Sequence, residues 1–313
     1  MAIDYAITAQ GLTKSYGTNH VLKGIDINVR RGTMLALLGP NGAGKTTVVR
    51  ILSTLLKADK GSVTVEGYDL AKDADKVRTV IGLTGQSAAV DELLTGRENL
   101  VMMGRLYRLT QDSARARAQE LLEEFDLTKA ADRPAKTYSG GMRRRLDLAV
   151  SLIASPPVIF LDEPTTGLDP RSRLSMWAII NDLKAKGTTI LLTTQYLEEA
   201  DQLADNIIVI DGGKVIAEGT SSQLKAKVGK DRLEISFKDA KTLAAAIKKL
   251  GNSVVDASDK DNSLTVVLSD TNKDLRKVLD DLAAAKLELS GMAVHKPTLD
   301  DVFLSLTGKK ETK

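Results

Sequence analysis

A glycine-rich segment between an apolar run and an amphipathic run constrains this chain more than any other feature. The segment Gly39-Pro-Asn-Gly-Ala-Gly-Lys45-Thr46 matches G-x-x-x-x-G-K-[ST] and directly follows the apolar run from Met34 to Leu38. After it, apolar residues recur with helical spacing at Val48, Val49, Ile51, Leu52 and Leu55. A strand, a glycine loop and a helix in this order bind phosphate, because loop amides and the helix N-terminus converge on it. The sequence therefore predicts a P-loop whose ligand is a nucleoside triphosphate.

Each residue type in this loop has its own role. Glycines let the backbone amides approach phosphate oxygens, Lys45 neutralises β- and γ-phosphate charge, and the Thr46 hydroxyl is offered to Mg²⁺. The residues expected to hold the nucleotide here are Gly39, Pro40, Asn41, Gly42, Ala43, Gly44, Lys45, Thr46 and Thr47.

Composition removes several other classes of protein. The 313 residues balance 44 Lys and Arg against 41 Asp and Glu, so bulk charge does not indicate nucleic acid binding. The absence of cysteine excludes a disulfide scaffold, a thiolate zinc site and a cysteine nucleophile. No secretory signal is expected, and the longest uncharged run, Leu148 to Leu161, is short and holds two prolines, so no transmembrane helix is expected. We expect a cytoplasmic chain whose membrane contact is peripheral.

The first part of the chain, residues 1–220, has the pattern of an α/β domain with a mostly parallel sheet. Its central strands should be uniformly apolar, because helices cover both faces of such a sheet; the candidates are 34–38, 158–161, 189–192 and 207–210. Two amphipathic helices are predicted between them, one through Ala114 to Phe125 and one from Ser139 to Ala154. They belong to a helical subdomain at about residues 87–155.

Residues 221–307 form a second domain in this interpretation. The pattern there is strand, helix, strand, given twice: 232–237, 241–250 and 253–257, then 264–268, 274–285 and 287–292. A doubled βαβ unit of this size predicts a small ferredoxin-like α+β domain. The tail 308–313 is expected to be disordered.

An acidic pair, Asp162-Glu163, follows the apolar run that starts at Val158. The carboxyl ends of parallel strands are where open α/β sheets bind ligands, and carboxylate oxygens suit Mg²⁺. Asp162 is therefore the expected Mg²⁺ partner, and Glu163 can orient and deprotonate the attacking water. The alternative is that the pair is a solvated strand end.

A second helix N-terminus that could bind an anion is predicted at Tyr138-Ser139-Gly140-Gly141-Met142. Here the sequence resembles the ATP-binding cassette family, whose signature is usually Leu-Ser-Gly-Gly-Gln; the Ser-Gly-Gly core is kept, and the likeness spans most of residues 5–220. The resemblance implies that Tyr16 stacks on adenine, that Gln86 joins Mg²⁺ and water to a transmembrane partner, and that Asp169 belongs to the D-loop.

The resemblance also implies an assembly and a reaction. In a head-to-tail homodimer the Ser139 loop of one protomer would cover the γ-phosphate held by the P-loop of the other. ATP binding would close this dimer and hydrolysis would open it, with ATP and Mg²⁺ as the cofactors. The catalytic residues are then Lys45, Glu163 and Gln195.

Gln195 marks a departure from the family, which normally has histidine at this place. A glutamine amide can donate to the γ-phosphate and accept from water, but it cannot become a cation. His20 and His295 are the only histidines, and both are expected at the surface, away from the motifs.

Gln195, the stretch that starts at Thr84-Gly-Gln86, the arginine run after Met142 and the closing Thr298-Leu-Asp-Asp-Val-Phe-Leu304 together resemble the daunorubicin-resistance type of drug-export cassette. The implied function is an ATP-hydrolysing subunit that drives efflux of a lipophilic drug or antibiotic through a separate membrane permease. The alternatives are a soluble mechanochemical ATPase on ribosomes or DNA, and a weak ATP sensor.

Two further surfaces follow from the sequence. Arg143, Arg144 and Arg145 point in three directions on a helix, so a solvated or interface face is favoured over RNA binding. The permease should dock between Gln86 and Ser139. The candidate contacts are Ala88, Val90, Leu93, Leu94 and Tyr107, with packing of the helical subdomain as the alternative for all five.

Overall fold

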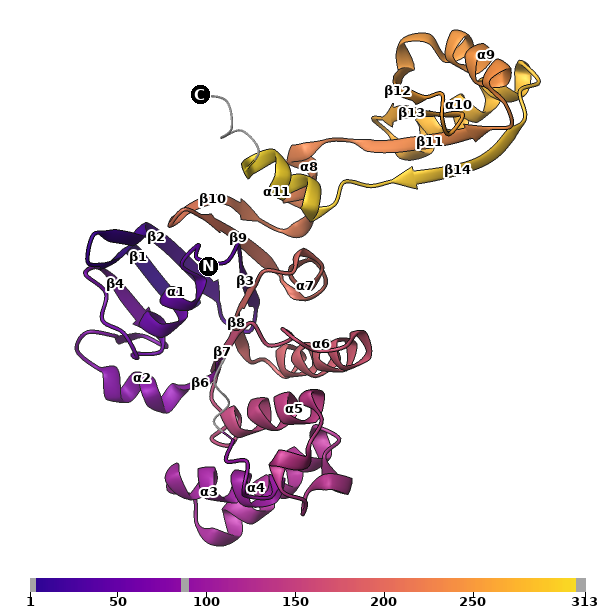
Figure 1. Ribbon diagram of the computed structural model, residues 1–313. Coiled ribbons are helices and arrows are strands. Elements are labelled where there is room, and N and C mark those ends of the chain that lie inside the picture. The colour runs from indigo at the N-terminus through magenta and orange to yellow at the C-terminus, as the bar shows by residue number, and fades with distance from the viewer. Residues whose placement is uncertain (1–3, 86–89, 308–313) are drawn as a thin grey trace. The chain divides into compact units, whose positions relative to one another are not determined.

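A computed structural model of the chain describes residues 4–85 and 90–307 (Figure 1). Gln86, Ala88 and the tail 308–313 lie outside the described residues. The chain divides into two compact units, Met1–Ser221 and Ser222–Lys313.

A six-stranded sheet forms the centre of the first unit. Its strand order is β10-β9-β3-β8-β7-β6, with β10 antiparallel to β9 and the other five strands parallel. The strands are β3 (Met34–Leu38), β6 (Ile81–Thr84), β7 (Val158–Asp162), β8 (Thr189–Thr194), β9 (Asn206–Asp211) and β10 (Lys214–Gly219). The four predicted central strands are confirmed, each extended by two residues at most.

Alternate residues of these strands enter two different hydrophobic cores. Leu35 and Phe160 belong to one core, and Ile159 and Leu192 belong to the other. Because both faces of the sheet are covered, a strand gains by being apolar at every position, which is the pattern seen in the sequence.

A four-stranded antiparallel sheet of order β2-β1-β4-β5 covers the first of these cores, and the sequence analysis had not separated it from the parallel sheet. Its strands are β1 (Tyr5–Tyr16), β2 (Asn19–Arg30), β4 (Lys60–Val65) and β5 (Tyr68–Asp69), followed by α2 (Ala74–Val80).

The helix after the P-loop, α1 (Lys45–Leu52), is shorter than the apolar repeat predicted. Thr54 takes a left-handed φ of 66°, which ends the helical path, and Leu55 lies beyond it with 66% of its surface exposed. The prediction that the helical pattern continues to Leu55 is therefore wrong.

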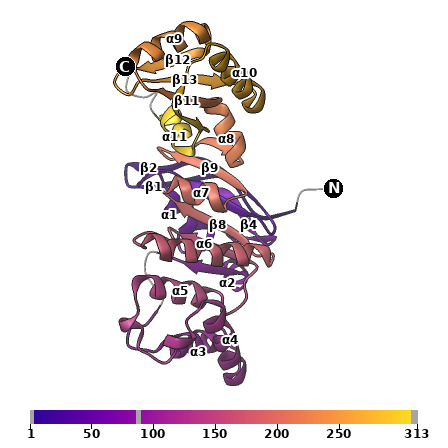
Figure 2. The same ribbon diagram turned by 90° about the vertical axis from the view of Figure 1, so that its right-hand side faces the viewer.

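Five more helices belong to the first unit within its described residues. They are α3 (Gly96–Leu106), α4 (Gln111–Glu124), α5 (Gly140–Ser151), α6 (Pro170–Ala185) and α7 (Leu197–Leu203), with single 3₁₀ turns at Thr128–Ala130 and Ala135–Thr137. In Figures 1 and 2, α5 lies between α6 and the pair α3 and α4. The predicted stripe of α4 is buried from Ala114 to Leu122, and α5 ends three residues before Ala154.

The second unit is built around a four-stranded antiparallel sheet of order β12-β13-β11-β14. Its elements are α8 (Ser221–Val228), β11 (Asp231–Phe237), α9 (Ala240–Leu250), a 3₁₀ turn (Gly251–Ser253), β12 (Val254–Ser258), β13 (Ser263–Leu268), α10 (Thr271–Ala284), β14 (Leu289–His295) and α11 (Leu299–Thr307). The first and third of the four strands are central and α9 and α10 pack on them, which is the split βαβ arrangement expected from the doubled pattern.

Candidate functional site

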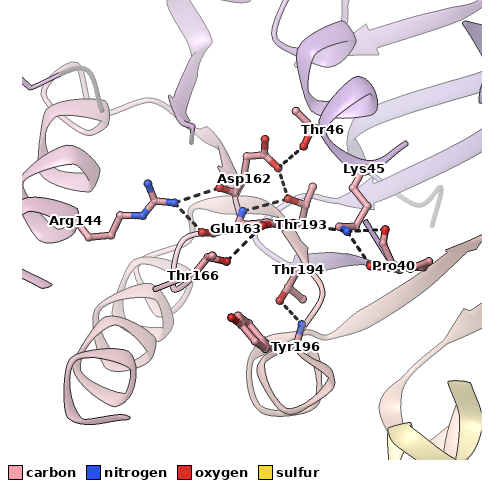
Figure 3. A network of polar contacts seen from close by, with 11 residues as sticks. Pro40, Lys45, Thr46, Arg144, Asp162, Glu163, Thr166, Thr193, Thr194 and Tyr196 are labelled. Carbon is pink, nitrogen blue, oxygen red and sulfur yellow. Dashed lines mark hydrogen bonds and ion pairs between the residues drawn. The ribbon is translucent and has the colours of Figure 1, made fainter. Parts of the chain in front are cut away.

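Three loops with polar side chains leave the same edge of the parallel sheet. β8 lies between β3 and β7, and the register pairs Leu38 with Thr194 and Asp162 with Thr193. The P-loop follows β3, Gln195 follows β8, and Glu163 follows β7. The strand order therefore brings together residues that are distant in sequence, and Figure 3 shows the resulting polar network.

The P-loop has a backbone that only glycine fits at several positions. Gly42 and Gly44 have φ values of 81° and 107°, in the region that favours glycine. A Cβ on Gly39 would lie 2.2 Å from the carbonyl oxygen of Ile210, and one on Gly44 would lie 2.6 Å from Leu22. Since β9 and β2 press against the loop in this way, the backbone is held as a cradle of the kind that phosphate requires.

Lys45 is buried, with 4% of its surface exposed, and reaches back over the loop. Its Nζ donates to the carbonyl oxygens of Gly39 at 2.7 Å and Pro40 at 3.1 Å, and lies 3.6 Å from Oε1 of Glu163. Burial lowers the pKa of Lys45, and the Glu163 carboxylate opposes this effect. The cation is thus held where the phosphates of a bound nucleotide would need it.

Asp162 is buried at the end of β7 and accepts two hydroxyl hydrogen bonds. The Thr46 hydroxyl donates to Oδ1 at 3.2 Å, and the Thr193 hydroxyl donates to the same oxygen. A threonine hydroxyl beside a carboxylate is a hard-oxygen donor set that suits Mg²⁺, which takes its other ligands from phosphate and water. Sequence reasoning gave Thr193 no role; its place directly after an apolar strand, beside the strand of Asp162, was the available signal.

Glu163 has an unusual backbone conformation, with a φ of 52°. Its amide donates to the carbonyl oxygen of Thr193 at 3.1 Å and to the hydroxyl of Thr193 at 3.2 Å. The carboxylate accepts from the Thr166 hydroxyl at 3.4 Å and faces Lys45. A buried carboxylate at this edge of the sheet is not the solvated strand end that was the alternative.

The structure corrects the expectation for the three arginines of α5. Arg143 is partly exposed and pairs with Glu92 at 2.7 Å, and Arg145 donates to the carbonyl oxygen of Phe125 at 3.0 Å. Arg144 and Arg145 are mostly buried, with side chains 15% and 18% exposed, and Arg144 donates to backbone carbonyls beside Glu163. A solvated face is therefore the wrong description for both: Arg144 lies where α5 meets the sheet edge, and Arg145 lies against the end of α4.

The Ser-Gly-Gly segment begins α5. The Ser139 hydroxyl accepts from the amide of Met142 at 3.3 Å, and Ser139 and Gly140 are exposed. Tyr138, where the family usually has leucine, is buried and donates to the carbonyl oxygen of Ala130 at 2.7 Å. A Cβ on Gly141 would lie 2.7 Å from the Ser172 hydroxyl, so α5 and α6 approach closely at this glycine.

The remaining predicted residues lie around this centre. Asp169 is exposed and caps α6; the hydroxyl and amide of Ser172 donate to it and hold its pKa below the usual range. Tyr16 ends β1 with 47% of its surface exposed. Gln195 is half-buried between β8 and α7. His20 and His295 are exposed, as expected.

A buried carboxylate that the sequence analysis missed lies behind the site. Glu199 of α7 accepts from the Thr165 hydroxyl at 2.7 Å and from the Trp177 indole at 3.1 Å. Burial raises the pKa of Glu199, and the hydroxyl and indole hydrogen bonds oppose this effect in part.

A glycine cradle with a lysine, a hydroxyl and carboxylate pair, and a buried glutamate at adjacent strand ends define a P-loop nucleoside triphosphatase. The comparisons with known proteins make this class specific. Residues 22–166 match the family model "ABC transporter", and residues 219–307 match "ATP-binding protein DrrA1-3-like, C-terminal domain". The chain belongs to the ATP-binding cassette family. It is an ATPase subunit of the type that carries a DrrA-like C-terminal domain.

Individual relatives agree over nearly the full length. The chain is 52% identical to the daunorubicin resistance ATP-binding protein DrrA3 of Streptomyces coeruleorubidus, over 97% of this chain and 96% of that protein. It is 36% identical to the linearmycin resistance ATP-binding protein LnrL of Bacillus subtilis, over 97% and 98% of the two chains. Among solved structures, the dimeric, post-hydrolysis ATP-binding cassette MJ0796 is 27% identical with a TM-score of 0.63, over 68% of this chain and 98% of that one.

Proposed function

We propose that this chain is the energy-supplying subunit of an exporter that moves a lipophilic drug or antibiotic through a separate membrane permease. Two relatives named for resistance to different drugs, daunorubicin and linearmycin, align with this chain over almost its whole length. An energy-supplying subunit does not have to touch its cargo, so this common architecture is compatible with different drugs.

The observation that carries the catalytic part of the proposal is the contact of Glu163 with Lys45 across the strand ends. ATP would lie with its phosphates in the glycine cradle and its adenine on Tyr16. Thr46 and Asp162, with Gln86, would hold the Mg²⁺ that neutralises phosphate charge. Glu163 would take a proton from the attacking water, and the Gln195 amide would donate to the γ-phosphate.

A second copy of the chain completes this site in the proposal. Ser139 and Gly140 are exposed at the start of α5, where backbone amides and the helix N-terminus favour an anion. In a head-to-tail dimer these amides would cover the γ-phosphate bound by the partner protomer, with Asp169 nearby. The dimeric state of the solved relative supports this arrangement.

The permease would dock on an exposed apolar surface of the first unit. Leu55 and Tyr107 are 66% and 42% exposed and line one hollow together with Leu83 and Met103. Leu93 and Leu106 are exposed as well. Val90, one of the predicted contacts, packs in the core of the helical subdomain and is removed from the docking surface.

The proposed location follows from this docking. No helix within residues 4–85 and 90–307 is long and apolar enough to cross a bilayer. Because the permease would bind the chain, we infer that the chain is held at the cytoplasmic face of the membrane through the permease.

The decisive catalytic experiment is Glu163→Gln in the full-length chain. ATP turnover should fall by about 100-fold or more while ATP binding survives, because the amide cannot accept the proton from water. Equal loss of binding and turnover would contradict the assigned role, and unchanged turnover would favour an ATPase that uses another base.

The docking surface can be tested by co-purification with a candidate permease, a membrane protein from the same cells that binds the parental chain. Tyr107→Asp and Leu55→Asp should each weaken co-purification by roughly tenfold, because a carboxylate would have to be desolvated at an apolar contact. Val215→Asp, on exposed β10 away from this surface, is the matched control. Equal retention of the membrane protein by all three variants would contradict the proposed surface.

A further inference from the structure

Arg144 makes an unusual set of contacts with the backbone beside Glu163. Its Nε donates to the carbonyl oxygen of Pro164 at 2.8 Å, and its Nη1 donates to that of Gly85 at 2.8 Å. Its Nη2 donates to the carbonyl oxygens of Asp162 at 3.2 Å and Glu163 at 2.7 Å. All three nitrogens of the guanidinium therefore bind backbone, and Figure 3 shows the side chain pointing from α5 to this turn.

The Arg144 guanidinium is buried, so these contacts belong to the folded interior of the protein. The Arg144 side chain is 15% exposed, and the carboxylate of the buried Asp147, one turn later in α5, lies 3.7 Å from it. Burial lowers the pKa of Arg144, and Asp147 opposes this effect. A planar fork of five N–H donors can satisfy several carbonyls at once, whereas the single ammonium of lysine cannot reproduce that geometry.

The contact explains how Glu163 keeps its left-handed conformation. A residue with a side chain pays a steric cost at a φ of 52°, and such a conformation persists only when its surroundings hold it. Thr193 accepts from the Glu163 amide on one side, and Arg144 donates to the Glu163 carbonyl on the other. Both peptide groups of Glu163 are fixed, and with them the direction of its carboxylate.

The same contact links two other parts of the site. Gly85 is the last described residue before Gln86, and it follows β6, which pairs with β7. Arg144 belongs to α5, whose first turn carries Gly140 and Gly141. One side chain thus joins the helix that would reach the partner's nucleotide to the turn that carries Glu163.

We propose that Arg144 is a positioning residue for hydrolysis, which sets the Glu163 carboxylate and ties it to α5. The inference rests on the proposed role of Glu163 as the base. Arg144 does not reach substrate in this arrangement; it acts through the backbone of residues 162–164. Its loss should therefore lower the rate of the chemical step and leave ATP binding by the P-loop intact.

The test is a double-mutant cycle in the full-length chain with Arg144→Met and Glu163→Gln. Arg144→Met should lower kcat by roughly 10- to 100-fold while the dissociation constant for ATP, measured with a fluorescent analogue, changes less than about threefold. When Arg144→Met is added to Glu163→Gln, kcat should fall little further, because both substitutions remove the same function, proton transfer by a correctly placed Glu163. Arg144→Lys should recover only a small part of the rate.

Arg145→Met is the matched control. Arg145 lies on the same helix and also donates to backbone carbonyls, those of Phe125 and Asp126, but these belong to the helical subdomain. It should lower the midpoint of thermal unfolding about as much as Arg144→Met does and leave kcat within about twofold.

The outcomes separate the two proposals. If Glu163→Gln alone leaves turnover unchanged, the proposed function of Glu163 fails. If Glu163→Gln lowers turnover as expected but Arg144→Met and Arg144→Lys keep the parental kcat, Arg144 is not a positioning residue. The same conclusion holds if the losses of rate from Arg144→Met and Glu163→Gln multiply in the double mutant. If Arg144→Met does not fold, Arg144→Lys decides the question by the same cycle.

Discussion

The hydroxyl of Thr46 lies 3.2 Å from Oδ1 of Asp162, although 116 positions of the chain separate the two residues. Thr46 lies in the first turn of α1, the helix after β3, and Asp162 ends β7, two strands away in the sheet. A hydroxyl beside a carboxylate is a pair of hard-oxygen donors that would suit a divalent cation.

Asp162→Asn should therefore separate metal-dependent hydrolysis from nucleotide binding. The asparagine side chain has the same shape as aspartate and keeps a hydrogen bond with Thr46, but it lacks the negative charge that favours Mg²⁺. We expect ATPase activity to fall by about 100-fold and the Mg²⁺ concentration for half-maximal activity to rise, with ATP binding in chelator little changed. A Mg²⁺ titration of turnover measures both effects, and an unchanged titration would remove Asp162 from the metal site.

Gln195 should act on the γ-phosphate through its amide. Gln195→Ala removes the donor and should lower turnover by roughly 10- to 100-fold, whereas Gln195→His supplies another N–H donor and should retain more activity. Steady-state ATPase assays of both variants, with ATP affinity measured in parallel, test this. A Gln195→Ala protein that hydrolyses ATP at the parental rate would contradict the proposed role of Gln195 at the γ-phosphate.

Glu199 should make stability fall as pH rises. Its folded-state pKa is raised by burial above the ordinary value of 4.5, so the folded chain binds more protons than the unfolded chain above that pH. The contribution of Glu199 is therefore fully present at low pH and is lost as pH rises through the folded pKa. In Glu199→Gln, which keeps an oxygen for Thr165 and Trp177, this part of the pH dependence should vanish.

Urea unfolding of the parental chain and of Glu199→Gln between pH 5 and pH 8 measures how the free energy of unfolding depends on pH. The fluorescence of Trp177, the one tryptophan, is the signal. Parallel pH profiles for the parental chain and the variant would contradict the prediction.

Gly141→Ala should weaken the coupling between α5 and α6. The new Cβ would lie 2.7 Å from Oγ and 3.0 Å from Cβ of Ser172. The hydroxyl would have to turn away and disturb its hydrogen bond with Asp169, and the Cβ contact requires the two helix starts to separate by a few tenths of an ångström. We expect ATP-driven dimerisation and turnover to fall by about tenfold or more, with ATP binding by the separate protomer retained. Adding Ser172→Gly removes both contacting atoms and should restore part of the activity; no rescue would mean that the contact is not the cause.

Local sequence patterns were sufficient for much of the fold. The P-loop was recognisable because its glycines, lysine and threonine are neighbours in the chain, and the uniformly apolar strands revealed a sheet covered on both faces. The doubled strand-helix-strand pattern likewise predicted the second unit, since short-range periodicity is enough to specify a split βαβ unit.

Patterns were insufficient where a residue's environment comes from a distant segment. Leu55 continued an apolar repeat, yet the left-handed turn at Thr54 placed it at the surface. Arg144 looked like any helical arginine in a basic run, and only the approach of α5 to the end of β7 buried it.

The sequence by itself determined the class of this protein, because the atoms that recognise phosphate come from one continuous loop whose chemistry is local. The tertiary structure alone decided how the catalytic edge is held. The strand order places Thr193 beside Asp162, and α5 brings Arg144 to the backbone of Glu163. These contacts depend on which strands are neighbours and on where a helix packs, and both are properties of the whole folded unit.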